Sequence, residues 1–247
     1  MFPIIMRSKW IILGLTLFAP LAGMPQVSAG SHNSAVYINV SERNNGKPLP
    51  PLTAENVRVK IGNKIVPVIR IEKDEAVRRI AILLDSSGSM QRVRAEWLAA
   101  SSIAAAIAAT APTSTELSFV SFGSDDNKVL LTDKDHKEFV EKIAALRGVQ
   151  PSIPLHRTDL WDSIANATQK PLLLQGGNAV FVITDGGDTA SHIQPNKLEK
   201  RLCKAGIRVF GFVLQATAPR TEEERDGPTN LYSLARQTGG GVLLLAA

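Results

Sequence analysis

From residue 77 to the C-terminus, short apolar runs alternate with segments of helical pattern, and this alternation limits the fold more than any other feature of the sequence. The apolar runs are continuous, which is typical of strands buried on both faces. Strands are predicted at residues 80–84, 116–123, 128–131, 178–184, 207–214 and 241–245, with helices near 92–110, 134–146, 160–170, 198–205 and 230–237. We therefore predict an α/β fold with a doubly wound, mostly parallel central sheet and helices on both faces.

The first 29 residues have the three-part layout of a secretory signal peptide. Arg7 and Lys9 precede an apolar stretch at residues 10–21, and Val27 and Ala29 are the small residues before a cleavage point. The alternative is an uncleaved anchor, although the apolar stretch is shorter than the roughly 20 residues that a spanning helix needs. We predict cleavage, export to the periplasm or the outside of a bacterial cell, and no membrane span afterwards.

Residues 30–76 form a β-rich leader segment, predicted as a strand plus a hairpin. The pattern "AVYINV" predicts the strand, and "VRVKIGNKIVPVIRI" predicts two strands joined by a tight turn at Gly62-Asn63. Pro67 suggests an edge position for the second of these. A hairpin alone is marginally stable in water, so we expect the leader to pack on the domain that follows, residues 77–247.

Charge and cysteine content exclude several classes of protein. Without Arg7 and Lys9, the chain has 26 basic and 23 acidic residues. This balance is too even to indicate nucleic acid or an anionic membrane as the partner. Cys203 is the only cysteine, so the chain cannot form an internal disulfide. Its place in a predicted helix favours a small buried residue over a reactive thiol.

Oxygen-bearing side chains gather where predicted strands end. In "ILLDSSGSM", Asp85, Ser87 and Ser89 occupy alternate positions of one turn, and "FVITDG" ends in Asp185. A third loop brings Thr158 to the start of a helix. In doubly wound sheets, sites lie at the carboxyl ends of the strands, so these side chains can meet at one point. Because all are hard oxygen donors, the set suits Mg²⁺, with Mn²⁺ or Ca²⁺ as alternatives, and argues against zinc.

This pattern resembles the von Willebrand factor type A (VWA) domain family, whose fold is Rossmann-like. "DSSGSM" matches the D-x-S-x-S part of that family's metal-ion-dependent adhesion site (MIDAS), and Thr158 and Asp185 match its separate threonine and its "TDG" aspartate. The resemblance covers residues 77–247, and the leader before it is similar to an exported bacterial subgroup. The family's domain usually continues into a final helix, which we expect this chain to lack because it stops after "GVLLL".

The resemblance implies how the site works. Ser87 and Ser89 would bind a Mg²⁺ ion directly, Thr158 directly or through water, and Asp85 and Asp185 largely through water. Mostly neutral direct ligands leave the charge of the ion poorly balanced, which favours a Glu or Asp carboxylate from a partner protein. The expected function is therefore metal-dependent protein binding, as in cell adhesion, without catalysis.

Other interpretations of the same residues remain open. Serines and aspartates between a strand and a helix often act only as caps. A structural subunit of an envelope complex could use the same metal site to hold a neighbouring subunit. A phosphatase of the haloacid dehalogenase type is less well supported, because its chemistry needs an acid where this chain has Ser87. In the loop of residues 148–157, His156 and the adjacent Arg157 are the candidate partner contacts.

Overall fold

The structure is a computed structural model that describes residues 11–15, 51–72, 78–92, 94–123, 129–131, 135–148, 158–169, 177–215 and 222–246. The chain divides into two compact units, one made up mostly of residues up to 76 and the other mostly of residues from 77 onward. The predicted strand "AVYINV" lies outside the described residues.

The small unit contains a three-stranded sheet, ordered β1 (Ile11–Leu15), β2 (Val57–Ile61) and β3 (Lys64–Val66). The predicted hairpin is confirmed, because β2 and β3 pair antiparallel on either side of Gly62, whose φ of 59° suits glycine in a tight turn. β1 pairs parallel with β2. This strand lies inside the predicted signal peptide and would be lost on cleavage, which stays a prediction.

The large unit has a six-stranded sheet in the order β6-β5-β4-β7-β8-β9. Its strands are β4 (Arg79–Asp85), β5 (Glu116–Phe122), β6 (Val129–Leu131), β7 (Ala179–Thr184), β8 (Arg208–Gln215) and β9 (Gly241–Ala246). All neighbouring pairs are parallel except β5 and β6, which are antiparallel. The predicted mostly parallel sheet is confirmed.

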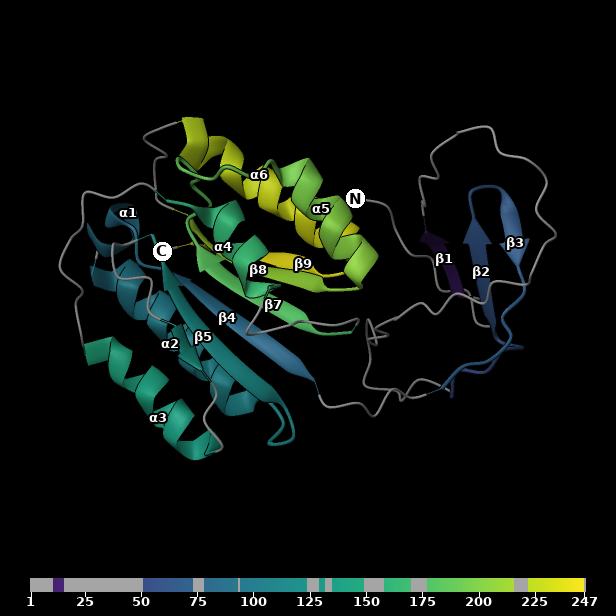
Figure 1. The fold of residues 1–247 in the computed structure, drawn as a ribbon, viewed down its shortest axis with the longest axis horizontal. Helices are drawn as coiled ribbons and strands as arrows, with labels where there is room; N and C mark the ends of the chain where they lie inside the picture. Colours follow the sequence, from purple (N-terminus) through teal and green to yellow (C-terminus); the bar gives the residue numbers. More distant parts are fainter. Residues whose placement is uncertain are drawn as a thin grey trace. The chain divides into compact units, whose positions relative to one another are not determined.

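Helices cover both faces of this sheet, as the doubly wound prediction requires (Figure 1). α2 (Arg94–Thr110) and α3 (His136–Ala145) pack on one face over a core that includes Ile82, Leu84 and Phe119. α4 (Leu160–Ala167), α5 (Pro195–Ala205) and α6 (Glu222–Gln237) pack on the other over a core that includes Leu83 and Val182. Successive residues of β4 thus enter opposite cores, which explains its continuous apolar run.

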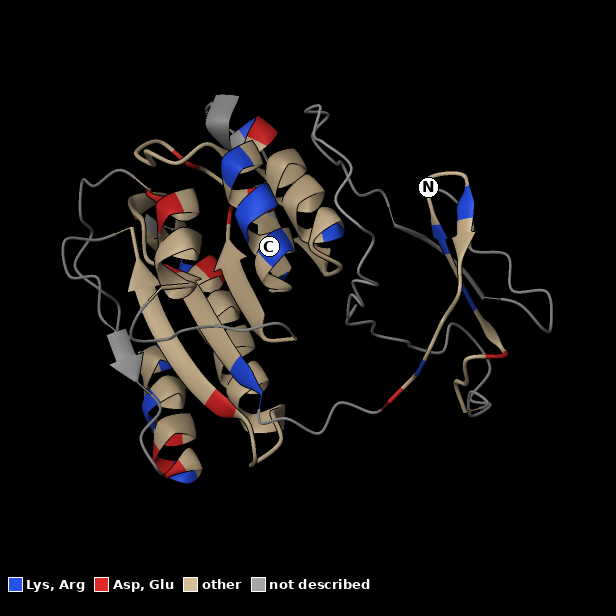
Figure 2. Ribbon diagram, turned by 45° about the vertical axis from the view of Figure 1, so that its right-hand side comes forward, with Lys and Arg blue, Asp and Glu red and all other residues tan. Residues whose placement is uncertain are grey.

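Charged residues of the large sheet stand only at strand ends (Figure 2). Arg79 opens β4 beside Glu116 of β5, and their side chains form an ion pair of 2.6 Å at the end of the sheet opposite Asp85. Among the described helices, none is both long and apolar enough to cross a membrane.

Two sequence predictions differ from the structure. α6 begins at Glu222, eight residues before the predicted start, and continues through Pro228. The pair Gly227-Pro228 normally interrupts a helix, so the pattern alone placed the start after it. Cys203 is exposed, with Sγ 3.4 Å from the carbonyl of Gln237, and the prediction of a buried residue was wrong. It lies on the solvent side of α5, whose buried residues are Leu198 and Leu202.

Thr238 supports a testable prediction about stability. Its buried hydroxyl accepts a hydrogen bond from the backbone N–H of Val209 at 3.1 Å and donates to carbonyl oxygens at the end of α6. Thr238→Val keeps the volume but leaves that buried N–H without an acceptor, which costs about 1–3 kcal/mol. Urea unfolding should show this loss for Thr238→Val, whereas Thr238→Ser, which keeps the hydroxyl, should lose clearly less. A loss in Thr238→Ser with none in Thr238→Val would instead assign the stabilisation to the methyl group, which valine keeps.

Candidate metal centre

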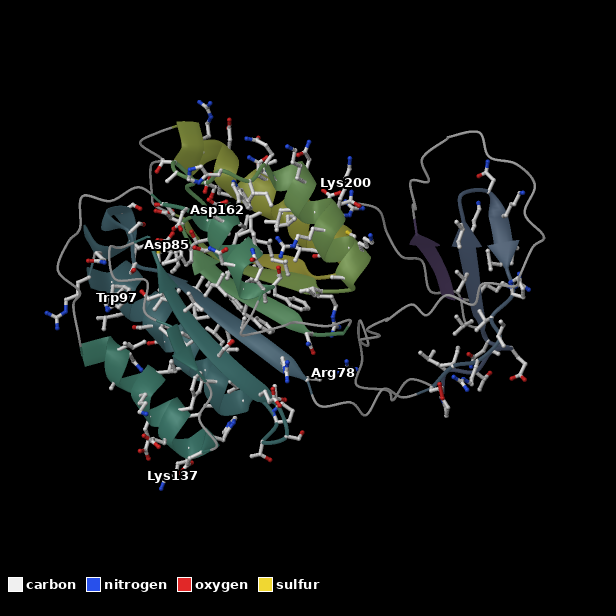
Figure 3. The ribbon with its side chains drawn as sticks, in the orientation of Figure 1. Arg78, Asp85, Trp97, Lys137, Asp162 and Lys200 are labelled. Carbon is white, nitrogen blue, oxygen red and sulfur yellow. The ribbon has the colours of Figure 1, made fainter. Side chains whose placement is uncertain are left out.

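Two neighbouring strands end in polar residues at the same edge of the large sheet. β4 ends at Asp85, and β7 ends at Thr184, directly before Asp185. These strands pair parallel, and the order of strands along the sheet reverses between them. Figure 3 labels Asp85 at this end of β4 and Arg78 near its opposite end. Ligand sites of open α/β sheets lie at such a reversal point.

The turn after β4 brings three of the predicted site residues together. Asp85 Oδ1 accepts a hydrogen bond of 2.8 Å from the backbone N–H of Ser87. Ser87 Oγ and Ser89 Oγ are 3.0 Å apart. α1 (Gly88–Arg92) starts within this turn, so Ser89 stands in its first turn. The spacing D-x-S-x-S therefore places two hydroxyls side by side next to one buried carboxylate.

Ser86 fixes this turn to the neighbouring strand. Its backbone N–H and its hydroxyl both donate to the carbonyl of Phe122, at 2.8 and 2.7 Å. The hydroxyl also accepts a hydrogen bond of 2.9 Å from Ser121 Oγ. Below it, the buried amide of Gln91 donates to the carbonyl of Ser86. The side chains of Ser86, Ser121 and Gln91 thus hold the backbone of this turn in place.

Thr184 joins the two strand ends. Its buried hydroxyl donates to Asp85 Oδ2 at 2.6 Å and accepts a hydrogen bond of 3.0 Å from the backbone N–H of Gly186. Asp185 Oδ1 accepts from the backbone N–H of Gly187 at 3.0 Å, which closes a tight turn. The position of Asp185 relative to Asp85 is thus set through Thr184.

Thr158 lies in a third segment, just before α4 begins. Its backbone N–H donates to Thr189 Oγ1 at 3.0 Å, and its carbonyl accepts from Thr189 and Ala190 at 2.8 and 3.0 Å. Further along α4, Asp162 accepts hydrogen bonds from the backbone N–H groups of His192 and Ile193, both at 2.9 Å. The Thr158 segment and the loop that follows Asp185 are therefore tied into one structure.

Negative charge is concentrated at this edge. Burial and the nearby carboxylate of Asp185 raise the pKa of Asp85 from 3.8 to about 7, although hydrogen bonds from Thr184 and Ser87 oppose the rise. Burial also raises the pKa values of Asp159 and Asp188. Two carboxylates that repel each other in a buried setting are stabilised by a cation placed between or beside them.

The residues fit a small divalent cation. Two neighbouring ligands of octahedral Mg²⁺, each about 2.1 Å from the ion, stand about 3.0 Å apart, which is the separation of the Ser87 and Ser89 hydroxyls. Gly123, with φ of 77°, leaves room beside them, since a Cβ there would lie 3.1 Å from Asp85 Oδ1. Among the described residues, no group of three or more His, Cys, Asp or Glu side chains forms a metal cluster. The candidate donors of this site are instead hydroxyls together with two carboxylates.

Sequence reasoning missed several residues that shape the site. Three residues beside the predicted site residues were not predicted to belong to the site: Thr184, Ser86 and Gly123. A threonine that ends an apolar strand directly before an aspartate was the available signal for Thr184. The closeness of Gly123 to Asp85 can be seen only once the fold is known, because it depends on the pairing of β5 with β4. The candidate partner contacts His156 and Arg157 lie outside the described residues.

The fold and the site together define a Rossmann-like α/β domain with an oxygen-lined centre at the reversal point of its sheet. The sequence model of the von Willebrand factor type A domain family matches residues 80–240, which is more than half of the chain. The protein therefore belongs to this family, whose domains are generally protein-interaction modules rather than enzymes. A comparison with curated proteins finds no significant match.

Solved structures show the same fold. Proximal thread matrix protein 1 from the mussel byssus is 20% identical, with a TM-score of 0.51, and the match covers 69% of this chain and 42% of that one. A von Willebrand factor type A protein from Catenulispora acidiphila is 17% identical, with a TM-score of 0.52, and the match covers 70% of this chain and 39% of that one. The chain thus spans about two fifths of the length of either relative, and the likeness concerns the fold.

Proposed function

We propose that this protein is an exported, metal-dependent protein-binding module that captures a carboxylate of its partner through a Mg²⁺ ion. The observation that carries the proposal is the pair of hydroxyls of Ser87 and Ser89, 3.0 Å apart beside the buried carboxylate of Asp85. Family membership supports a protein partner. The predicted signal peptide supports a periplasmic or secreted location.

The roles of the site residues follow from their chemistry. Ser87 and Ser89 would hold the ion directly, and Thr158 would do so directly or through water. Both oxygens of Asp85 already accept hydrogen bonds from Ser87 and Thr184, so this carboxylate would act through water and by its charge. Asp185 would act in the same way from the neighbouring turn. Bound Mg²⁺ would supply a Lewis-acidic centre with a coordination position for an outside carboxylate.

Binding rather than catalysis is the function that these side chains support. Neither Ser87 nor Ser89 has a histidine among its described hydrogen-bond partners to activate it as a nucleophile. The position two residues after Asp85 is a serine, which cannot protonate a leaving group as a phosphatase of the haloacid dehalogenase type requires. A Glu or Asp from a partner protein is the ligand that best complements a cation held by neutral oxygens.

Calorimetry and pull-down assays test this proposal together. Titration of the chelator-treated protein with Mg²⁺ should show one saturable site, and Mn²⁺ or Ca²⁺ should compete for it. The immobilised protein should then retain a partner from bacterial envelope extract in Mg²⁺ and release it in EDTA. Full retention of the same partner in EDTA, or no Mg²⁺ binding at millimolar concentration, would overturn the proposal.

A further inference from the structure

The backbone of α6 touches the Asp185 turn at a place where two glycines meet. A Cβ built on Gly227 would lie 1.7 Å from the carbonyl oxygen of Gly186 and 2.5 Å from its carbonyl carbon. A Cβ on Gly186 would lie 2.8 Å from Cδ of Pro228. Real Cβ atoms do not approach other atoms so closely, so only glycine at both positions allows this contact.

The helix that makes this contact carries a cost for it. Gly227 and Pro228 both lie inside α6, where glycine and proline are unfavourable relative to alanine. Proline also removes a donor from the helix. Further along, Leu231, Leu234 and Ala235 of α6 are buried in the core, which fixes the helix against the sheet. The helix therefore presents the bare backbone of Gly227 and the ring of Pro228 to the turn after β7.

The contacted turn is the one that holds the candidate metal centre. Gly186 follows Asp185 directly and adopts φ of 96°, which other residues rarely adopt. Its N–H donates to Thr184 Oγ1, which in turn donates to Asp85 Oδ2. A displacement of Gly186 would thus move Asp185 and disturb the bond that links it to Asp85.

We propose that Gly227, with Pro228 beside it, is a positioning residue that sets the affinity of the centre for a divalent cation by holding the Asp185 turn against α6. This inference rests on the proposed function, because it concerns the same site. It assigns a role to residues that lie on a different element and contribute no ligand. The contact couples the position of α6 to the separation of the two carboxylates.

Gly227→Ala tests the proposal, with Mg²⁺ alone as the probe. We expect the affinity for Mg²⁺, measured by calorimetry, to fall at least tenfold. The matched control is Gly240→Ala, because a Cβ there would lie 1.8 Å from the carbonyl oxygen of Val209, near the opposite end of the sheet. Gly241→Ala serves as the neutral control, since nothing lies within 4 Å of its Cβ position.

The controls separate positioning from stability. Gly227→Ala and Gly240→Ala should both lower the thermal midpoint, but only Gly227→Ala should lose Mg²⁺ affinity. Pro228→Ala is the second variant, in case Gly227→Ala does not fold. It removes the ring that packs on Gly186 and restores a helix donor, so we expect weaker Mg²⁺ binding with an unchanged or higher midpoint.

Three results would overturn or redirect the inference. Wild-type affinity for Mg²⁺ in folded Gly227→Ala or in Pro228→Ala would refute it. An equal loss of affinity in Gly240→Ala would show that general destabilisation is the cause, which also refutes it. Absence of Mg²⁺ binding in the wild-type protein would instead refute the proposed function on which it rests.

Discussion

Ser87→Ala is expected to abolish Mg²⁺ binding and Mg²⁺-dependent partner binding while the domain stays folded. The hydroxyl of Ser87 lies 3.0 Å from that of Ser89, and its removal deletes a direct ligand of the proposed ion. The hydrogen bond that shapes the turn comes from the backbone N–H of Ser87 to Asp85 and is kept by alanine. We therefore expect at least a hundredfold loss of Mg²⁺ affinity with a stability change below about 1 kcal/mol.

Asp85→Ala should give the same loss of binding, together with loss of the hydrogen bonds from Ser87 and Thr184. Ser118→Ala is the matched control, because Ser118 is a buried serine of β5 whose hydroxyl faces the carbonyl of Ile80 rather than the site. Calorimetry and urea unfolding on the three variants check both quantities. Unchanged Mg²⁺ affinity in Ser87→Ala would remove the main support for the metal centre.

The sheet could be predicted from the sequence because burial on both faces leaves a strong pattern. β4 and β7 are continuously apolar between their ends, and helices follow them in the chain, so a parallel sheet was the main solution. The site could be predicted because the carboxyl ends of β4 and β7 meet at one edge, whatever the details of the loops. The sequence therefore predicted five site residues before their positions were known: Asp85, Ser87, Ser89, Thr158 and Asp185. Their role as metal ligands stays a prediction.

Features that depend on contacts between distant segments could not be predicted. The start of α6 was placed too late because Gly227-Pro228 is unfavourable in a helix, and only its contact with Gly186 accounts for the glycine. Gly123 was not selected, since its closeness to Asp85 arises from the pairing of β4 with β5. Thr184 looked like the last residue of a strand, and its bond to Asp85 requires the parallel pairing of β4 with β7. In each case the cause is a tertiary contact, and only Thr184, which stands between an apolar strand and Asp185, leaves a local signal in the sequence.

The stability of the metal-free protein should depend on pH through Asp85, and Mg²⁺ should reverse that dependence. In the folded protein, burial and the charge of Asp185 raise the pKa of Asp85 to about 7, whereas its ordinary value is 3.8. The folded state thus binds a proton that the unfolded chain releases. The stabilisation is complete below about pH 4 and is lost as the pH rises through 7, by up to about 4 kcal/mol.

Asp85→Asn removes this effect, because its amide cannot ionise and carries no charge that repels Asp185. In EDTA, urea unfolding between pH 5 and pH 8 should show the wild type losing stability relative to Asp85→Asn as the pH rises. With Mg²⁺, the wild type should gain stability mainly above pH 7, since the ion must compete with the proton for the carboxylates. Parallel pH profiles for the two proteins in EDTA would mean that Asp85 is already ionised at pH 5. The repulsion between Asp85 and Asp185 that favours a bound cation would then have to be offset within the protein itself.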